Sequence, residues 1–149
     1  MSIHFDKFAS DGNAFIKELC MRFNYPDRRT QACIIIRAVL HTLRDSIAIP
    51  ESLNVLSQLP MFLKAVYVEN WKYREKPRRY KNIEDFTRAV EEEQRAYGER
   101  RFDWDISTEE IVRTVLDALG KYVSEGEYED IAAELPEPLK NLVQIKIRS

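Results

Sequence analysis

The stretch of this 149-residue sequence best suited to binding chemistry is a run of cations mixed with aromatic side chains. Residues 71–81, WKYREKPRRYK, contain six cations and one acid, a local charge of +5. Cations attract phosphates and carboxylates, and aromatic rings stack on bases or lie at a lipid interface. One interpretation is therefore an anion-binding surface, for nucleic acid, a phosphorylated ligand or a membrane surface. Its candidate residues are Trp71, Lys72, Tyr73, Arg74, Arg78, Arg79 and Lys81.

A structural role for the same run is the interpretation that the sequence favours. The segment that follows is acidic, with Glu84, Asp85 and a run of glutamates at 91–93. An internal ion-pair network with these acids would neutralise the cations, and surface pairs of this kind contribute little to stability. In this interpretation Trp71 fills a gap in the core, and the run connects two parts of the fold.

A second candidate is a polar stripe along one predicted helix. Arg37, His41, Arg44 and Asp45 are spaced so that they share one helical face. A histidine between two arginines is held neutral at pH 7, and the three side chains together would bind a carboxylate or phosphate. The alternative, which we favour, is that the arginines pair with carboxylates across the seam between two halves of the chain.

Catalytic motifs are missing from the sequence. It contains no glycine-rich phosphate loop, nucleophile elbow, His-Glu-x-x-His or Cys-x-x-Cys motif. The carboxylates of RRFDWDISTEE, residues 100–110, and of GEYED, residues 126–130, could ligate a hard cation. The acids of residues 103–110 resemble a calcium loop only loosely, however, because no glycine stands at the turn. We therefore expect no enzymatic activity, no catalytic residues, no metal and no cofactor. Cys20 and Cys33 match no metal spacing, and we expect both to be buried free thiols.

Composition places the chain among ordinary globular proteins and favours helices. It is 44% apolar and 32% charged, and only four glycines occur. The net charge of −2 gives no overall attraction to nucleic acid. No apolar run approaches the roughly 20 residues of a membrane span, and MSIHFDKF lacks the layout of a signal peptide. These features predict a cytoplasmic protein without a transmembrane segment.

The sequence repeats itself at an offset of 76 positions. Residues 35–66 align with residues 111–142 without a gap, and ten of the 32 positions are identical. The matched apolar residues keep helical spacing throughout, which indicates an internal duplication. The identical pairs are Ile35/Ile111, Arg37/Arg113, Val39/Val115, Leu40/Leu116, Leu43/Leu119, Glu51/Glu127, Leu59/Leu135, Pro60/Pro136, Leu63/Leu139 and Lys64/Lys140.

Apolar spacing within each half predicts four helices. The first starts near Asp11 and ends before Asn24, and the two longest, about 30–47 and 108–123, are central. Pro50 and Pro60 fit the first turns of the third and fourth helices. Ser107 and Ser124, each followed three residues later by a glutamate, predict two capping boxes. Pro136 and Pro138 would open the last short helix. The predicted fold is all-α, with two pseudo-symmetric four-helix repeats, residues 8–70 and 83–144, joined by a basic linker, residues 71–82, in one domain spanning 1–149.

Three stretches also resemble a known bacterial family. These are RAVLHTLRDSI at 37–47, QLPMFLK…Y…W at 58–71 and VSEGEYEDIAAELPEPLKNL at 123–142. The chain resembles the family catalogued as domain of unknown function twenty-two sixty-seven. The resemblance implies a helical fold and a bacterial cytoplasmic setting, with no established activity. Family members often carry Arg-Gly in place of Lys64-Ala65 and Gly-Trp in place of Asn70-Trp71.

Two functional hypotheses follow from the sequence. The first is a non-enzymatic interaction module that presents a helical surface to an unidentified protein partner or to a second copy of the chain. The second is an anion-binding protein that uses the basic linker. Tyr67, Trp71 and Tyr73 support the first hypothesis, since aromatic residues are frequent interface anchors.

Overall fold

The computed structural model describes residues 2–148 and contains helices without strands over that range. The all-α prediction is therefore confirmed, including for residues 33–36, whose β-branched composition could have suited a strand. The α-helices are α1 (Phe5–Arg22), α2 (Arg29–Asp45), α3 (Ile49–Gln58), α4 (Met61–Val68), α5 (Ile83–Ala96), α6 (Thr108–Ala118), α7 (Glu125–Glu134) and α8 (Lys140–Arg148). Two short 3₁₀ helices, Leu119–Lys121 and Glu137–Leu139, complete the chain.

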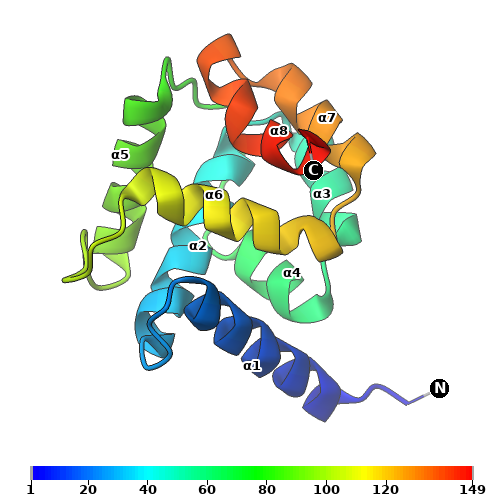
Figure 1. Ribbon diagram of the computed structural model, residues 1–149. Helices are drawn as coiled ribbons and strands as arrows, with labels where there is room; N and C mark the ends of the chain where they lie inside the picture. The colour runs from blue at the N-terminus through cyan, green and yellow to red at the C-terminus, as the bar shows by residue number, and fades with distance from the viewer. Residues whose placement is uncertain (1, 149) are drawn as a thin grey trace.

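Helices α2 and α6 lie in the centre of the fold, as predicted (Figure 1). Helix α2 packs against α1, α4, α5 and α6, and α6 also packs against α1, α5 and α8. Helices α7 and α8 pack closely on each other, and α7 also touches α3. The core between these helices is aliphatic with a few aromatic rings, and Leu40 and Leu116 are at most 1% exposed.

Two helix boundaries differ from the prediction. Helix α1 starts at Phe5, because Lys7 pairs with Asp11 one turn later and the first turns hold together without a buried apolar face. Helix α6 ends at Ala118 and continues only as a 3₁₀ turn around Gly120, a residue that weakens helices. The longest helices are consequently α1 and α2, with 18 and 17 residues, and not α2 and α6.

Side-chain caps and prolines set several helix starts. The hydroxyl oxygens of Ser107 and Ser124 accept hydrogen bonds from the backbone N–H three residues later, as expected for an N-cap. Pro50 lies in the first turn of α3, and Pro60 is the N-cap residue of α4. Asn70 has a φ of 54°, a left-handed conformation that asparagine tolerates better than most residues.

The bounds of α3 and α7 agree with the 76-residue offset of the sequence. Adding 76 to the bounds of α3, 49–58, gives those of α7, 125–134. The aligned apolar pairs Leu40/Leu116 and Leu63/Leu139 are buried on both sides. The duplication itself, with halves 8–70 and 83–144, stays a prediction that superposition of the two halves would test.

The two cysteines differ in burial. Both thiols are free, but only Cys20 is buried; the expectation of burial is wrong for Cys33, which is half-buried near the start of α2. Within the described residues, no helix combines the length and apolarity that crossing a membrane requires.

Candidate functional site

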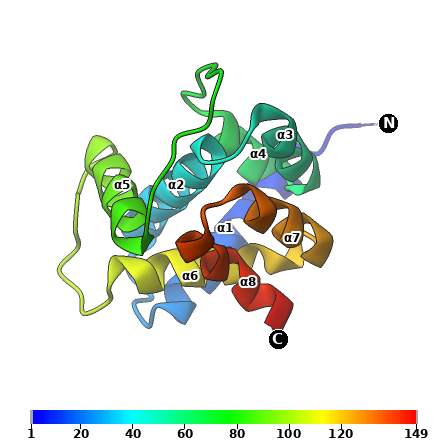
Figure 2. The same ribbon diagram turned by 90° about the horizontal axis from the view of Figure 1, so that it is seen from above.

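The basic linker is an extended segment between α4 and α5, outside any helix. Part of it projects from the molecule, and the rest runs beside α2 to the start of α5 (Figure 2). One backbone contact holds it there, since the N–H of Arg78 donates to the carbonyl of Asp45 over 2.8 Å. The N–H and the carbonyl belong to residues 33 positions apart, so the linker is fixed against the C-terminal end of α2.

The expected ion-pair network of the linker does not form among the described residues. None of its six cations makes a salt bridge with a described acid. The predicted pairing is wrong, and three acids of α5 pair instead with cations on their own helix and on the loop after it. Asp85 pairs with Arg88, Glu91 with Arg100 and Arg101, and Glu92 with Arg95 and Arg100.

Most of the linker side chains face solvent. Tyr73 is 80% exposed, and Lys72, Lys76 and Lys81 are exposed as well. The clearest anchored cation is Arg79, whose guanidinium donates to the carbonyl of Glu134 at the end of α7. The linker therefore presents an uncompensated positive charge together with a free aromatic ring.

Trp71 anchors the start of the linker to the core. Its ring is half-buried and meets the buried ring of Tyr67 edge to face, with centroids 5.8 Å apart. The guanidinium carbon of Arg44 lies 5.6 Å from the Trp71 ring centroid, in cation–π range. The expectation that Trp71 fills a gap in the core agrees with this packing.

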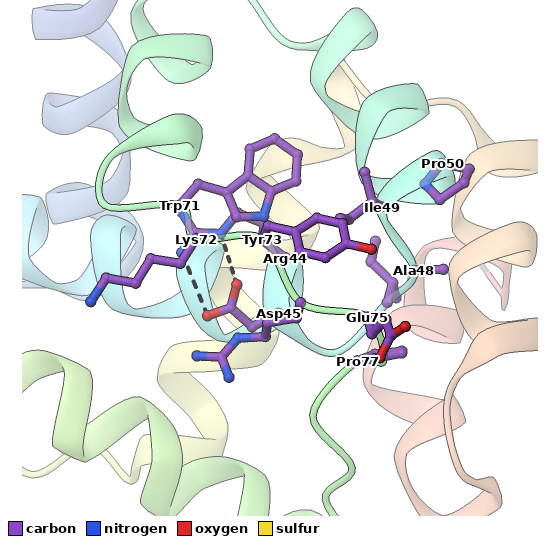
Figure 3. Close-up of a pocket in the computed structure, with 12 residues that line it drawn as sticks. Arg44, Asp45, Ala48, Ile49, Pro50, Trp71, Lys72, Tyr73, Glu75 and Pro77 are labelled. Carbon is purple, nitrogen blue, oxygen red and sulfur yellow. Dashed lines mark hydrogen bonds and ion pairs between the residues drawn. The ribbon is translucent and has the colours of Figure 1, made fainter.

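A shallow cleft of about 280 Å³ lies where the linker leaves the core. Trp71 and Tyr73 line one side, and residues 47–50, at the end of the α2–α3 connection and the start of α3, line the other. Figure 3 shows the Asp45 carboxylate at the base of the cleft, with its hydrogen bonds drawn as dashed lines. The cleft joins an aromatic wall to a charged rim, an arrangement that suits a side chain or a short extended segment of a partner.

Arg44 is not available to an external anion. Its side chain is buried, and its guanidinium donates to the carbonyls of Tyr67 and Glu69 over 2.7 and 2.8 Å. It also donates to Asp45 over 2.9 Å. These bonds satisfy carbonyl oxygens at and just after the C-terminal end of α4, which otherwise lack partners, and place a positive charge at the negative end of its dipole.

His41 is buried beside Arg44 and serves the same helix end. Its Nε2 lies 2.7 Å from the carbonyl of Val66. Since a carbonyl only accepts, Nε2 carries the hydrogen, and Nδ1 faces the hydroxyl of Tyr97 at 3.4 Å. Burial lowers the pKa of His41, the bond to Val66 opposes this, and the charge of Arg44 lowers it further. The neutral form expected from the sequence thus has burial as its main cause.

Of the three basic residues Arg37, His41 and Arg44, only Arg37 has a half-exposed side chain. It donates to Glu69 over 3.0 Å and lies over the Tyr97 ring. The expectation that Arg37 and Arg44 pair with carboxylates across the seam between the halves is wrong, because Glu69 and Asp45 belong to the first half. Arg37, His41 and Arg44 therefore stabilise the end of α4 and do not extend the linker surface.

The structure brings Glu51 together with two acids of the GEYED stretch, a combination that the sequence did not predict. Glu51 of α3 and Glu127 and Asp130 of α7 each place one carboxylate oxygen within 4.8 Å of those of the other two. Burial, and then the neighbouring carboxylates of Glu51 and Asp130, raise the pKa of Glu127 to about 8. A signal was present in the sequence, since Glu51 and Glu127 are an identical pair at the 76-residue offset. The acids of residues 103–110 behave differently, with Asp103 paired to Arg28 and Glu109 to Arg113.

Comparison with known protein families gives a match over most of the chain. A family model described as uncharacterized conserved protein (DUF2267) matches residues 12–142. No curated protein matches the sequence significantly.

Proposed function

The chain belongs to the DUF2267 family of uncharacterized conserved proteins, and we propose that it is a non-enzymatic binding module whose basic linker docks an acidic segment of a protein partner. The observation that carries this proposal is the charge of the linker. Six cations there lack ion-pair partners among the described residues, while Asp85, Glu91 and Glu92 pair with cations elsewhere.

The surroundings of the linker support a protein partner. The exposed Tyr73 and the half-buried Trp71 border a cleft with an apolar wall, and aromatic rings beside cations are frequent anchors of protein interfaces. A local charge of +5 would steer an acidic partner toward this surface even though the whole chain carries −2. The extended backbone of the linker also leaves hydrogen-bonding groups free for a partner chain.

Anion binding to nucleic acid is the second candidate. The same cations would contact phosphates, and the ring of Tyr73, 80% exposed, would stack on a base. The chain as a whole has a negative net charge, which disfavours contacts between nucleic acid and the surface outside the linker. We therefore treat it as the alternative that the experiment must separate from the first.

Affinity capture with matched variants tests the proposal. The linker variant carries Lys72→Gln, Lys76→Gln and Lys81→Gln, three exposed side chains without a hydrogen bond to a described residue. The control variant carries Lys7→Gln, Lys17→Gln and Arg95→Gln, which removes the same charge from the exposed faces of α1 and α5. Wild type and control should capture the same protein from a lysate of the source organism, and the linker variant should lose it.

A titration with single-stranded DNA separates the two candidates. If nucleic acid is the ligand, wild type binds it with a log–log salt slope of about −3 for four phosphate contacts. The linker variant should then lose most of this binding. If the ligand is a protein, DNA binding by wild type stays weak. Capture that is equal in all three proteins would refute the use of the linker.

A further inference from the structure

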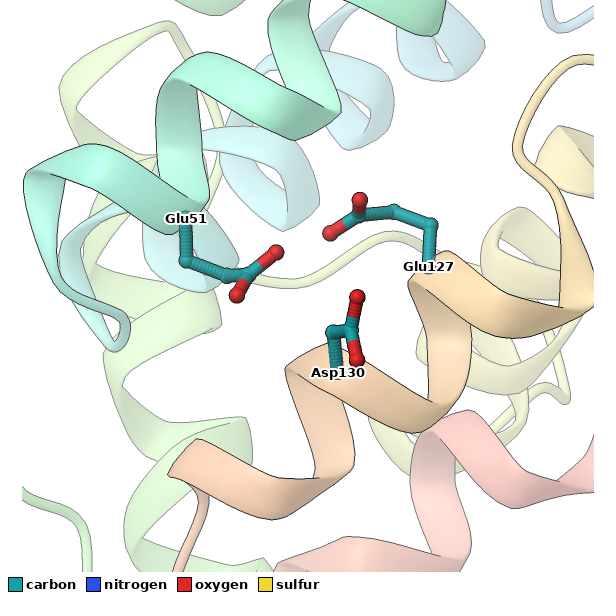
Figure 4. A group of neighbouring side chains, drawn as sticks. All are labelled: Glu51, Glu127 and Asp130. Atoms are coloured by element: carbon teal, nitrogen blue, oxygen red, sulfur yellow. The ribbon is translucent and has the colours of Figure 1, made fainter.

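Three carboxylates converge between α3 and α7 without a cation beside them. Glu51 extends from α3, and Glu127 and Asp130 extend from successive turns of α7 toward it (Figure 4). None of the three forms a salt bridge with a described residue. Three like charges this close repel one another, so a positive species is needed to hold them together.

The buried member of this group has an oxygen without a partner. Glu127 is 4% exposed, and its Oε1 accepts a hydrogen bond from the Gln58 amide over 3.1 Å. Its Oε2 is buried and has no hydrogen-bond partner, and the same is true of Oε2 of Glu51. A carboxylate oxygen only accepts, so two such oxygens aimed at one space require a proton or a metal ion between them.

We propose that Glu51, Glu127 and Asp130 bind a hard divalent cation, with Ca²⁺ as the best fit, between α3 and α7. An all-oxygen ligand set suits Ca²⁺, Mg²⁺ or Mn²⁺ and not the softer metals that prefer sulfur or imidazole. The exposed carboxylate of Asp130 leaves one side of the site open, so water completes the coordination.

The ligand set favours Ca²⁺, because Mg²⁺ demands near-ideal octahedral geometry and is usually bound through only one or two carboxylates. Two ligands at the Ca²⁺ distance of roughly 2.3–2.6 Å lie at most about 4.6–5.2 Å apart. The three oxygens lie within 4.8 Å of one another, a range that Ca²⁺ can bridge. Mg²⁺ binds at about 2.0–2.1 Å and requires its ligands to lie within about 4.2 Å of one another.

An ion at this position would hold two distant segments of the chain together. Glu51 lies in the half 8–70, and the other two ligands lie in the half 83–144, so one ion would link α3 to α7 across the chain.

Isothermal titration with CaCl₂ at pH 7.5 tests the proposal. Wild type should bind one Ca²⁺ per chain and should bind Mg²⁺ more weakly. At a Ca²⁺ concentration of about ten times Kd, the melting temperature should rise by about 3–6 °C.

Two ligand variants and one control variant show which acids bind the ion. Glu127→Gln and Asp130→Asn should each weaken Ca²⁺ binding at least about tenfold. Glu129→Gln removes an exposed acid from the same helix, outside the cluster, and should leave binding unchanged. Asp130 is exposed, so its variant reports on binding even if Glu127→Gln alters folding. Absence of Ca²⁺ binding in wild type would overturn the proposal and leave a proton as the species between the oxygens. Equal loss in Glu129→Gln would overturn it too.

Discussion

The buried guanidinium of Arg44 donates to the carbonyl of Tyr67, 2.7 Å away, and so connects the last turn of α2 to the last turn of α4. The side chain of the same Tyr67 is buried, and its hydroxyl donates a hydrogen bond to the hydroxyl oxygen of Ser52 in α3. Three helices of the first half thus meet through this pair of residues. A charged side chain that looks suited to ligand binding in the sequence holds the helices together instead.

Replacing Arg44 should destabilise the fold far more than replacing Arg37. Arg44→Gln leaves two carbonyls and Asp45 without their donor in a buried setting, which should cost about 2–4 kcal/mol. Arg37→Gln breaks a half-exposed pair with Glu69, which should cost no more than about 1 kcal/mol. Urea unfolding of both variants measures the difference, and similar costs would contradict the assigned roles.

The burial of His41 predicts a stability that increases with pH. Its folded-state pKa lies below the ordinary value of 6.5, so below that pH the unfolded chain binds more protons than the native one. The charged groups around the ring, Arg44 on its own helix, Glu93 on α5 and Glu69 after α4, do not reverse the effect of burial. The advantage of wild type over His41→Gln in urea unfolding should therefore be present at pH 7.5 and should shrink as the pH falls below 6.5.

The raised pKa of Glu127 predicts a contribution to stability that decreases as the pH rises. Its pKa is raised from 4.5 to about 8 in the folded chain, so between these values the native state holds a proton that the unfolded state has lost. The stabilisation from this group is complete below pH 4.5 and is lost as the pH rises toward 8. Glutamine does not titrate, so Glu127→Gln should gain stability relative to wild type between pH 5 and pH 8. Metal-free buffer with a chelator is required, and a constant difference over this range would contradict the raised pKa.

Much of the fold was predictable because apolar spacing depends on local sequence. The apolar stripe of residues 33–47 and the prolines at 50 and 60 located α2, α3 and α4 closely. The start of α1 was not predictable from that signal, because residues 5–10 form helix mostly through local polar contacts and not through a buried stripe. The end of α6 depended on Gly120, a single residue whose effect varies with the packing around it.

The sites were less predictable because they depend on contacts between distant segments. The composition of residues 71–81 located the basic linker, but not its unpaired state, since Arg100 and Arg101 approach Glu91 only through the loop after α5. The identity of Glu51 and Glu127 at the 76-residue offset was visible in the sequence. That the two carboxylates face each other depends on how α3 packs against α7, which no local pattern contains.

The two thiols should react at different rates in the native protein. Cys33 is half-buried, whereas Cys20 is buried among apolar side chains, and burial raises the pKa of its thiol. A thiol reagent should therefore label Cys33 well before Cys20, because it attacks the exposed thiolate. The single variants Cys20→Ser and Cys33→Ser assign the fast and slow phases, and equal native rates would contradict the burial. In denaturant both thiols should react fully and quickly.

The equivalence of Leu40 and Leu116 gives the last prediction. Both side chains are at most 1% exposed, on the central helices α2 and α6 and at positions separated by the 76-residue offset. Truncation to alanine at either position leaves a cavity and should cost about 2–5 kcal/mol. Glu129→Ala, on the exposed face of α7, should change stability by no more than about 0.5 kcal/mol. If the two halves arose by duplication, we expect the two leucine variants to have similar costs in urea unfolding. A large cost for one and a negligible cost for the other would argue that the two positions are not equivalent.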